Sequence, residues 1–307
     1  MQEIYTNKGS TDLDDEINLR ELFYVLLAGK WIIISITSFV SIIAVIYSLM
    51  LPNTYESKAL LVPVNPSNGI PGSRGYSGLI GLAGISLPAG VEKGNSKKAI
   101  KKISSLSFFE NNIIKNIYLP DLVAVKSWNS KTNIVAFNEN IYDTRTNTWK
   151  QQIPSAQKSF EVFKTKHLSL SEDKKSGFIT LSIKHQSPFV AKQWAELVVN
   201  EVNSFYRQKD KSESEKAVSY LNQQISMTGL SEIKQVLAQL LQEEIKKLTL
   251  IEANQYYVFD YIDPPAVMEN KVEPNRALIC IIGALLSGML SILLVLIRYY
   301  VFSERTQ

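Results

Sequence analysis

Residues 264–300 read PPAVMENKVEPNRALICIIGALLSGMLSILLVLIRYY, and this stretch decides the fold. Residues 277–297 within it carry no charge. About 20 apolar or small residues, each adding about 1.5 Å, span the roughly 30 Å hydrocarbon core of a bilayer. Arg276 precedes the run and Arg298 follows it with two tyrosines, as interfacial side chains do. A buried soluble helix of this length would keep a polar face, so residues 276–298 are predicted to be transmembrane.

A second uncharged run, WIIISITSFVSIIAVIYSLML, occupies residues 31–51 and is also long enough to span a bilayer. A cleaved signal peptide is the alternative interpretation. The run is longer than a signal h-region, an acidic tail at residues 12–16 precedes it, and it has no small-x-small cleavage pattern. We therefore expect a transmembrane helix, preceded by an amphipathic helix at residues 17–28.

Two spans place both termini on one side of the membrane. Lys30 before the first span and Arg298 after the second indicate that this side is the cytoplasm. Residues 1–30 and 299–307 are then cytoplasmic tails. Residues 52–275 lie outside the cytoplasm, which in a bacterium with two membranes means the periplasm.

The 307 residues are 45% hydrophobic with a formal charge of +4, averages that hide two apolar ends and a polar middle. The middle is long enough to bury its own hydrophobic core. The only cysteine, Cys280, falls in the second span, so no disulfide can form within one chain. The outer domain must therefore be held by packing alone.

The outer domain is predicted to have an α+β base, comprising residues 52–187 and 255–275. Residues 55–64, 178–185 and 255–263 have the composition of strands, and the second of these alternates apolar and polar side chains as a half-buried strand does. Residues 96–116 show helical spacing, with Ser96 as a candidate cap. Residues 119–166 are weakly patterned, and we expect irregular structure with one short helix.

A helical arm is predicted for residues 188–254. Ser187 is placed to cap its first helix, Pro188 suits the first position, and residues 207–216 are charged on every side. Continuous to about residue 224, this helix would run roughly 55 Å and project from the base. Gly229 permits a turn, and Ser231 is placed to cap a second helix. The predicted contacts between subunits are Trp194, Leu197, Val198, Leu237 and Leu241.

Two further sets of residues are candidates for function. Small residues in the second span let helices approach closely, although ordinary membrane composition would also supply them. Prolines before that span shape its approach to the membrane. The helix-packing residues are Pro264, Pro265, Pro274, Gly283, Ala284, Ser287 and Gly288. A lysine cluster is either a solvated face or an anion patch for lipid phosphates or an anionic glycan; its members are Lys97, Lys98, Lys101 and Lys102.

Other signals are weak. The glycine-rich residues 69–90 are interpreted as a mobile loop, or as an apolar loop that touches the membrane or a neighbouring subunit. His167 and His185, the only histidines, stand far apart in sequence without partners at metal-ligand spacing. No paired-carboxylate site or catalytic triad can be assembled. We therefore expect no catalysis, no cofactor, no metal and no nucleic-acid partner.

Short motifs at both ends of the chain carry a family resemblance. They are INLRELF at residues 17–23, GKW at 29–31, LPNTYESKA at 51–59, DPP at 263–265 and EPNRAL at 273–278. Together with the two spans and the long arm helix, they are similar to the Wzz-type chain-length determinants. These are the polysaccharide co-polymerases of bacterial surface glycan assembly.

The resemblance implies an inner-membrane protein that forms a ring of identical subunits and catalyses nothing. It implies that the ring sets the modal length of a glycan, usually lipopolysaccharide O-antigen, which a separate polymerase makes on a lipid carrier. The partners implied are copies of the chain itself, the polymerase and the lipid-linked glycan.

Three alternatives remain open. An export co-polymerase for capsule or exopolysaccharide would work with a separate tyrosine kinase, because no P-loop domain follows the second span. A sensor would need a cytoplasmic output module, and a glycan-modifying enzyme would need a catalytic site. Deleting a length regulator should leave glycan synthesis intact and randomise chain length.

Overall fold

The computed structural model describes residues 19–64, 94–254 and 256–303. Its contacts divide the chain into two compact units, Met1–Leu51 with Pro274–Gln307 and Pro52–Glu273. The fold is mixed α/β, with one long helix and two apolar helices, as the sequence predicts. The predicted glycine-rich loop at residues 69–90 and the acidic tail lie outside the described residues.

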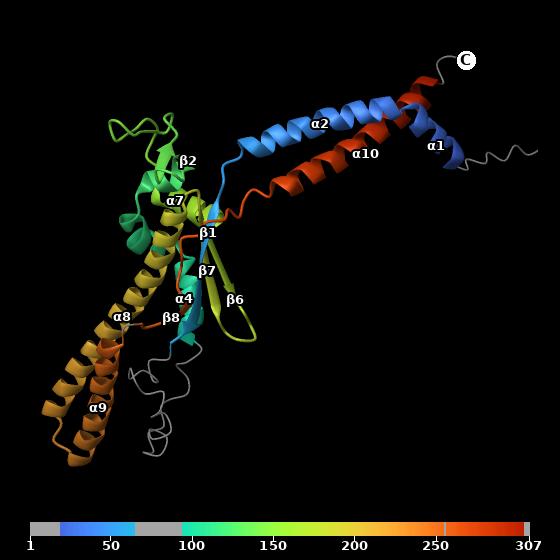
Figure 1. The fold of residues 1–307 in the computed structure, drawn as a ribbon. Coiled ribbons are helices and arrows are strands. Elements are labelled where there is room, and N and C mark those ends of the chain that lie inside the picture. The colour runs from blue at the N-terminus through green and yellow to red at the C-terminus, as the bar shows by residue number, and fades with distance from the viewer. Residues whose placement is uncertain (1–18, 65–93, 255, 304–307) are drawn as a thin grey trace, which may run out of the picture. The chain divides into compact units, whose positions relative to one another are not determined.

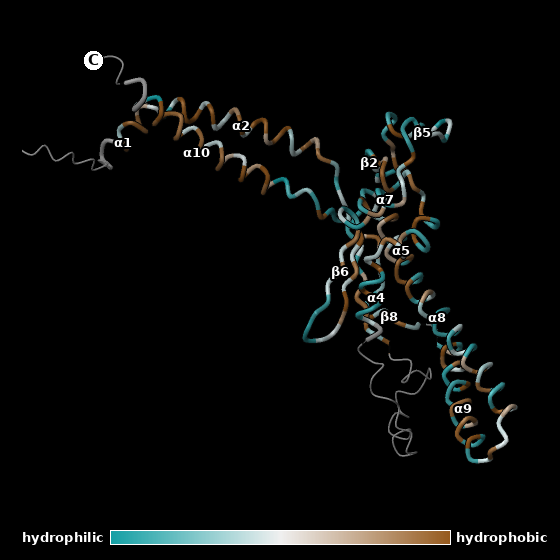
Figure 2. The backbone as a smooth tube through the Cα atoms, turned by 180° about the vertical axis from the view of Figure 1, so that it is seen from behind, coloured by the Kyte–Doolittle hydropathy of each residue, from teal (hydrophilic) through white to brown (hydrophobic). Residues whose placement is uncertain are grey.

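The first unit consists of α1 (Leu19–Ala28), α2 (Lys30–Met50) and α10 (Arg276–Ser303). The last two run side by side as an antiparallel pair and are apolar along their length (Figures 1 and 2). Both are long and apolar enough to cross a membrane. The Asn275 Oδ1 accepts a hydrogen bond from the Leu278 N–H at 3.2 Å and so caps the start of α10.

The second unit is built on a four-stranded antiparallel sheet in the order β6-β7-β1-β8. Its strands are β6 (Leu168–Glu172), β7 (Ile179–His185), β1 (Tyr55–Pro63) and β8 (Phe259–Asp263). The predicted half-burial of β7 is wrong, because five of its seven residues are buried. This strand lies between two others and packs on a helix, so only Thr180 and Lys184 are partly exposed.

The long helix α8 (Pro188–Met227) has 40 residues, or about 60 Å. Its first half packs on the sheet, and its second half leaves the sheet and pairs with α9 (Ser231–Ala253) as an antiparallel hairpin (Figure 1). Ser187 caps α8 as predicted, accepting from the Val190 N–H at 3.5 Å. The predicted cap of α9 is wrong: Leu230 precedes the helix, and no side chain caps it.

The chain between β1 and β6 forms several short elements. The helical ones are α4 (Gly94–Ile103), α5 (Leu106–Phe108), the π-helical turn η3 (Phe109–Ile113), the 3-10 turn η4 (Ile114–Asn116), α6 (Leu119–Val123), α7 (Ala156–Val162) and the π-helical turn η5 (Phe163–His167). Two hairpins stand among them, one of β2 (Val125–Asn129) with β3 (Ile134–Phe137) and one of β4 (Tyr142–Asp143) with β5 (Thr148–Trp149).

Two expectations for this region are wrong. The helix predicted for residues 96–116 starts at Gly94 and breaks after Ile103, because Ser105 caps a new turn by accepting from the Phe108 N–H at 3.3 Å. The region expected to be irregular forms hairpins instead. Asn133 and Asn147 adopt φ angles of 52° and 53°, the left-handed conformation that asparagine tolerates and tight turns require.

One buried side chain, Asn203 on α8, joins the helix to strand β8. Its Nδ2 donates to the Phe259 carbonyl at 2.9 Å, and its Oδ1 accepts from the N–H groups of Val258 and Phe259 at 2.8 and 2.9 Å. A little further along α8, the Tyr257 hydroxyl donates to the Asp210 carboxylate at 2.6 Å. These bonds fix the root of the arm to the edge of the sheet.

We predict that Asn203→Leu destabilises the base by about 2–4 kcal/mol, because it leaves the buried N–H groups of Val258 and Phe259 and the Phe259 carbonyl without hydrogen-bond partners. Urea denaturation followed by tryptophan fluorescence measures the change. The control is Asn111→Leu, at an exposed position whose side chain bonds only the Ser107 carbonyl of its own turn. Equal losses in the two variants would contradict the assigned role of Asn203.

Candidate functional sites

The contact between the two apolar helices is built on small residues. An ideal Cβ placed on Gly283 would lie 2.9 Å from the Ala44 Cβ, and Ser287 and Ser291 are buried. The Thr37 Oγ1 and Ser291 Oγ lie 3.5 Å apart across the pair. Gly283, Ser287 and Ser291 follow at intervals of four residues and form one ridge of α10. Two of the predicted packing residues therefore pack within one subunit, and Ser291 was not predicted.

The other predicted packing residues lie elsewhere. A Cβ on Gly288 would meet nothing within 4 Å, and Ala284 is half-buried. Pro264 is exposed and Pro265 buried in the irregular segment that follows β8, while Pro274 directly precedes the cap of α10. A contact of Gly288 with a helix of another subunit stays a prediction.

The predicted arm contacts divide between the base and the arm. Trp194 and Val198 are buried in the hydrophobic core of the base, and Leu197 packs against that core. These side chains are therefore used within one subunit. Leu237 and Leu241 lie half-buried on α9. The same helix also carries exposed apolar side chains; they are Ile233, Val236, Leu240 and Ile245.

The predicted lysine cluster lies on α4, and its members are not equivalent. Lys97, Lys98 and Lys101 are exposed. The Lys102 Nζ instead donates to the Ser107 Oγ at 3.0 Å and lies 4.7 Å from the centre of the Phe205 ring. That cation–π contact joins α4 to α8. Lys102 is therefore a packing residue, and an anion patch would rest on the remaining three lysines.

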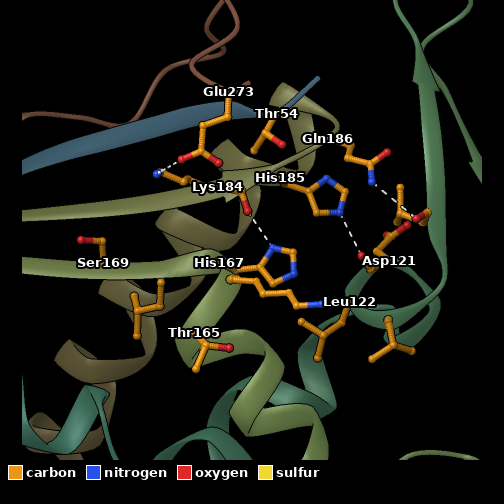
Figure 3. Close-up of a pocket in the computed structure, with 14 residues that line it drawn as sticks. Thr54, Asp121, Leu122, Thr165, His167, Ser169, Lys184, His185, Gln186 and Glu273 are labelled. Atoms are coloured by element: carbon orange, nitrogen blue, oxygen red, sulfur yellow. Dashed lines mark hydrogen bonds and ion pairs between the residues drawn. The ribbon is translucent and has the colours of Figure 1, made fainter. Parts of the chain in front are cut away.

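The structure reveals a cavity in the base that the sequence did not indicate. Its volume is about 540 Å³, within the range of about 300–1,000 Å³ typical of small-molecule sites. Five separate segments of the chain line it. Figure 3 shows the labelled side chains that these segments bring together. Its lining includes both histidines, two carboxylates and two lysines; these are His167, His185, Asp121, Glu273, Lys166 and Lys184.

The two histidines meet at the wall of this cavity, with ring centres 5.7 Å apart and the Trp194 ring against both. The His185 Nδ1 accepts from the Ser187 N–H at 2.9 Å, so its Nε2–H donates to the Asp121 carbonyl at 2.9 Å (Figure 3). The His167 Nδ1–H donates to the Lys184 carbonyl at 2.7 Å. Both rings thus tie neighbouring segments together in their neutral forms.

Burial sets the protonation of these groups. It lowers the pKa of His167, and it lowers the pKa of His185 to about 4. Burial also raises the pKa of the Asp121 carboxyl to about 6, and no ion pair to this carboxylate is found among the described residues. Among the described residues, no three His, Cys, Asp or Glu side chains are placed to hold a metal ion.

The meeting of the histidines follows from a hairpin that the sequence signals only weakly. Residues 173–177 read DKKSG, and the turn they form places Gly177 at a φ of 73°. The ladder pairs Leu168 with Ile183, which brings the two histidines together at the same end. Recognising this turn would have predicted their proximity.

Comparisons with known proteins find one family model that matches part of the chain. Residues 15–115 match the family model Wzz, "Chain length determinant protein". This confirms the resemblance to the Wzz-type polysaccharide chain-length determinants.

Two solved structures are similar to the chain. One is a "full-length bacterial polysaccharide co-polymerase", with 15% identity and a TM-score of 0.45, covering 94% of this chain and 100% of that one. The other is a "Fragment of WzzB, Polysaccharide Co-polymerase from Salmonella Typhimurium", with 14% identity and a TM-score of 0.31, covering 72% of this chain and 100% of that one. Among curated proteins, no sequence matches significantly.

The helix pair gives a matched prediction. In a Cys280→Ser background, Thr37→Cys with Ser291→Cys should form a disulfide on mild oxidation in membranes, because their hydroxyls lie 3.5 Å apart. Gly283→Leu should lower the yield several-fold, since its side chain would meet Ala44. Gly288→Leu should leave the yield unchanged. Equal disulfide yields in the Gly283→Leu and Gly288→Leu variants would contradict the assigned contact between α2 and α10.

The buried histidine and carboxylate give opposite pH dependences. Folded His185 stays neutral to about pH 4, so its stabilisation is complete above about pH 6.5 and is lost as pH falls from there to about 4, by about 3 kcal/mol. Asp121, with its raised pKa of about 6, lowers the stability at neutral pH, and this loss is relieved as acidification protonates the carboxylate.

We predict that Asp121→Asn steepens the acid loss of stability and His185→Gln reduces it, as measured by urea denaturation from pH 7 to 4. Parallel pH profiles for the two variants would refute this assignment.

Proposed function

We propose that this protein regulates the length of a bacterial surface polysaccharide, most specifically the modal length of lipopolysaccharide O-antigen, and that it catalyses no reaction. The observation that carries the proposal is the match of residues 15–115 to the chain length determinant model. That region runs from α1 through α2 and β1 to the short helices of the base. The glycan itself is made by a separate polymerase.

The proposed placement follows from the two apolar helices. In this proposal α2 and α10 span the inner membrane, both termini are cytoplasmic, and the second unit is periplasmic. The basic residues beside the spans support that orientation. The site of action is then the face of the membrane on which the polymer grows.

The arm supports a role as an oligomeric scaffold. Four apolar side chains on one helix, α9, are between 46% and 56% exposed: Ile233, Val236, Leu240 and Ile245. Ile233, Val236 and Leu240 follow at spacings of three and four residues, so they share one side of the helix. An exposed apolar row of this kind marks an interaction surface. Identical copies that meet through different faces close into a ring when the rotation between them allows it. We infer that α9 contacts the arm of a neighbouring copy.

A scaffold can set a length without breaking or making bonds. Chain length depends on the ratio between the rate of elongation and the rate of release. Several identical surfaces held in one ring raise the local concentration of bound glycan near the polymerase, and this changes that ratio. The bond chemistry stays with the polymerase.

The test uses a deletion strain complemented with variants, with lipopolysaccharide resolved by gel electrophoresis. Deletion should leave polymer in place and replace the mode by a broad distribution of lengths. Complementation with Val236→Glu plus Leu240→Glu should fail to restore the mode, because charges replace the exposed apolar row. Gln242→Glu, an exposed change on the same helix, should restore it fully.

Two results would count against the proposal. Loss of all polymer on deletion would indicate an exporter or an enzyme. An unchanged mode in the deletion strain would show that chain length is set elsewhere.

A further inference from the structure

The cavity of the base contains acceptors without donors. The Asp121 carboxylate, at the first turn of α6, has neither a hydrogen bond nor an ion pair among the described residues. The Gln186 Nε2 donates to the Val125 carbonyl at 3.5 Å (Figure 3). The buried Gln186 Oε1 has no hydrogen-bond partner among the described residues. Native proteins seldom leave a buried group such as the Gln186 Oε1 unpaired, so it calls for a donor supplied from outside. The Asp121 carboxylate is a second acceptor on the lining of the same cavity.

The charges of the cavity indicate a neutral ligand. Two carboxylates face two lysines, and the Lys184 Nζ is already held by the Glu273 Oε1 at 2.6 Å. Neither a polyanion nor a polycation is favoured by such a balanced lining. Hydroxyls of Thr54, Thr165 and Ser169 add groups that both donate and accept. A ligand rich in hydroxyl groups satisfies this set.

Three aromatic rings stand next to the cavity lining in sequence. Tyr55 follows Thr54, while Trp128 and Phe189 come three residues after Val125 and Gln186. The Tyr55 and Trp128 ring centres are 5.3 Å apart, and those of Trp128 and Phe189 are 6.3 Å apart.

The sheet register places one of these rings, Tyr55, on the face that carries the cavity residue His185, and the ring contacts lead from Tyr55 to Trp128 and Phe189. Tyr55 pairs directly with His185, so their side chains share one face of the sheet. Phe189 remains 46% exposed. Exposed aromatic faces offer apolar surface to the C–H faces of sugar rings, while polar groups nearby take the hydroxyls.

We propose that the cavity and the cluster of Tyr55, Trp128 and Phe189 form one binding site for a short stretch of neutral saccharide. Hydroxyl groups of the sugar donate to the Asp121 carboxylate and the Gln186 Oε1, and a sugar ring stacks on Phe189. This inference rests on the proposed function and names the surface of the base that holds the glycan. A ring of copies would then present one such site per subunit.

The test is equilibrium binding of the full chain in detergent micelles to the polysaccharide released by mild acid from lipopolysaccharide of the source strain. Isothermal titration calorimetry gives the affinity. We expect Asp121→Asn and Phe189→Ala each to weaken binding about tenfold or more, through loss of a charged acceptor and of a stacking surface. The matched controls are Glu139→Gln and Tyr220→Ala, at exposed positions away from the cavity lining, and they should bind as the unsubstituted chain does.

The proposal is overturned if the unsubstituted chain does not bind the polysaccharide, or if both site variants bind it with unchanged affinity. It is also overturned if the Phe189→Ala change weakens binding to phospholipid vesicles and not to the polysaccharide, because the rings would then be membrane anchors. Its failure is distinct from failure of the proposed function. If the deletion strain loses its modal chain length while the site variants bind the polysaccharide normally, the proposed binding site is wrong and the proposed regulation of length is still supported.

Discussion

The packing of the first half of α8 on the antiparallel sheet is the contact on which the rest of the second unit depends. Trp194 and Val198 fill the space over β7 and β1, and Asn203 ties the same helix to β8. The sheet pairs β1 and β8, which come from the two ends of this unit in the sequence. The helix that packs on the sheet therefore contacts both ends of the unit. The two histidines of the cavity contact the Trp194 ring of this layer.

One continuous helix serves two parts of the molecule. Its apolar first half is core, while its charged second half continues away from the sheet and pairs with α9. A two-helix hairpin buries little surface, which leaves the apolar row of α9 exposed. An exposed arm agrees with the proposed assembly, and the cavity of the base is the separate surface proposed for the glycan.

The sequence predicted the elements whose pattern is local and long. The two apolar runs, the 40-residue helix with its Ser187 cap, and strand β1 need only composition and periodicity to be found. The break after Ile103 and the hairpins at Asn133 and Asn147 depend on single turn residues, which periodicity does not detect. The cavity depends on register, because only the pairing of β6 with β7 brings His167 to His185. Trp194 was assigned to the arm because a helical stripe does not say which neighbour covers it.

The central claim is that this protein works by assembling with copies of itself. Native mass spectrometry of the full chain in lipid nanodiscs measures the number of subunits directly. We predict one dominant mass that equals two or more copies of the 34.6 kDa chain. A dominant monomer at protein concentrations matching those in the membrane would contradict it.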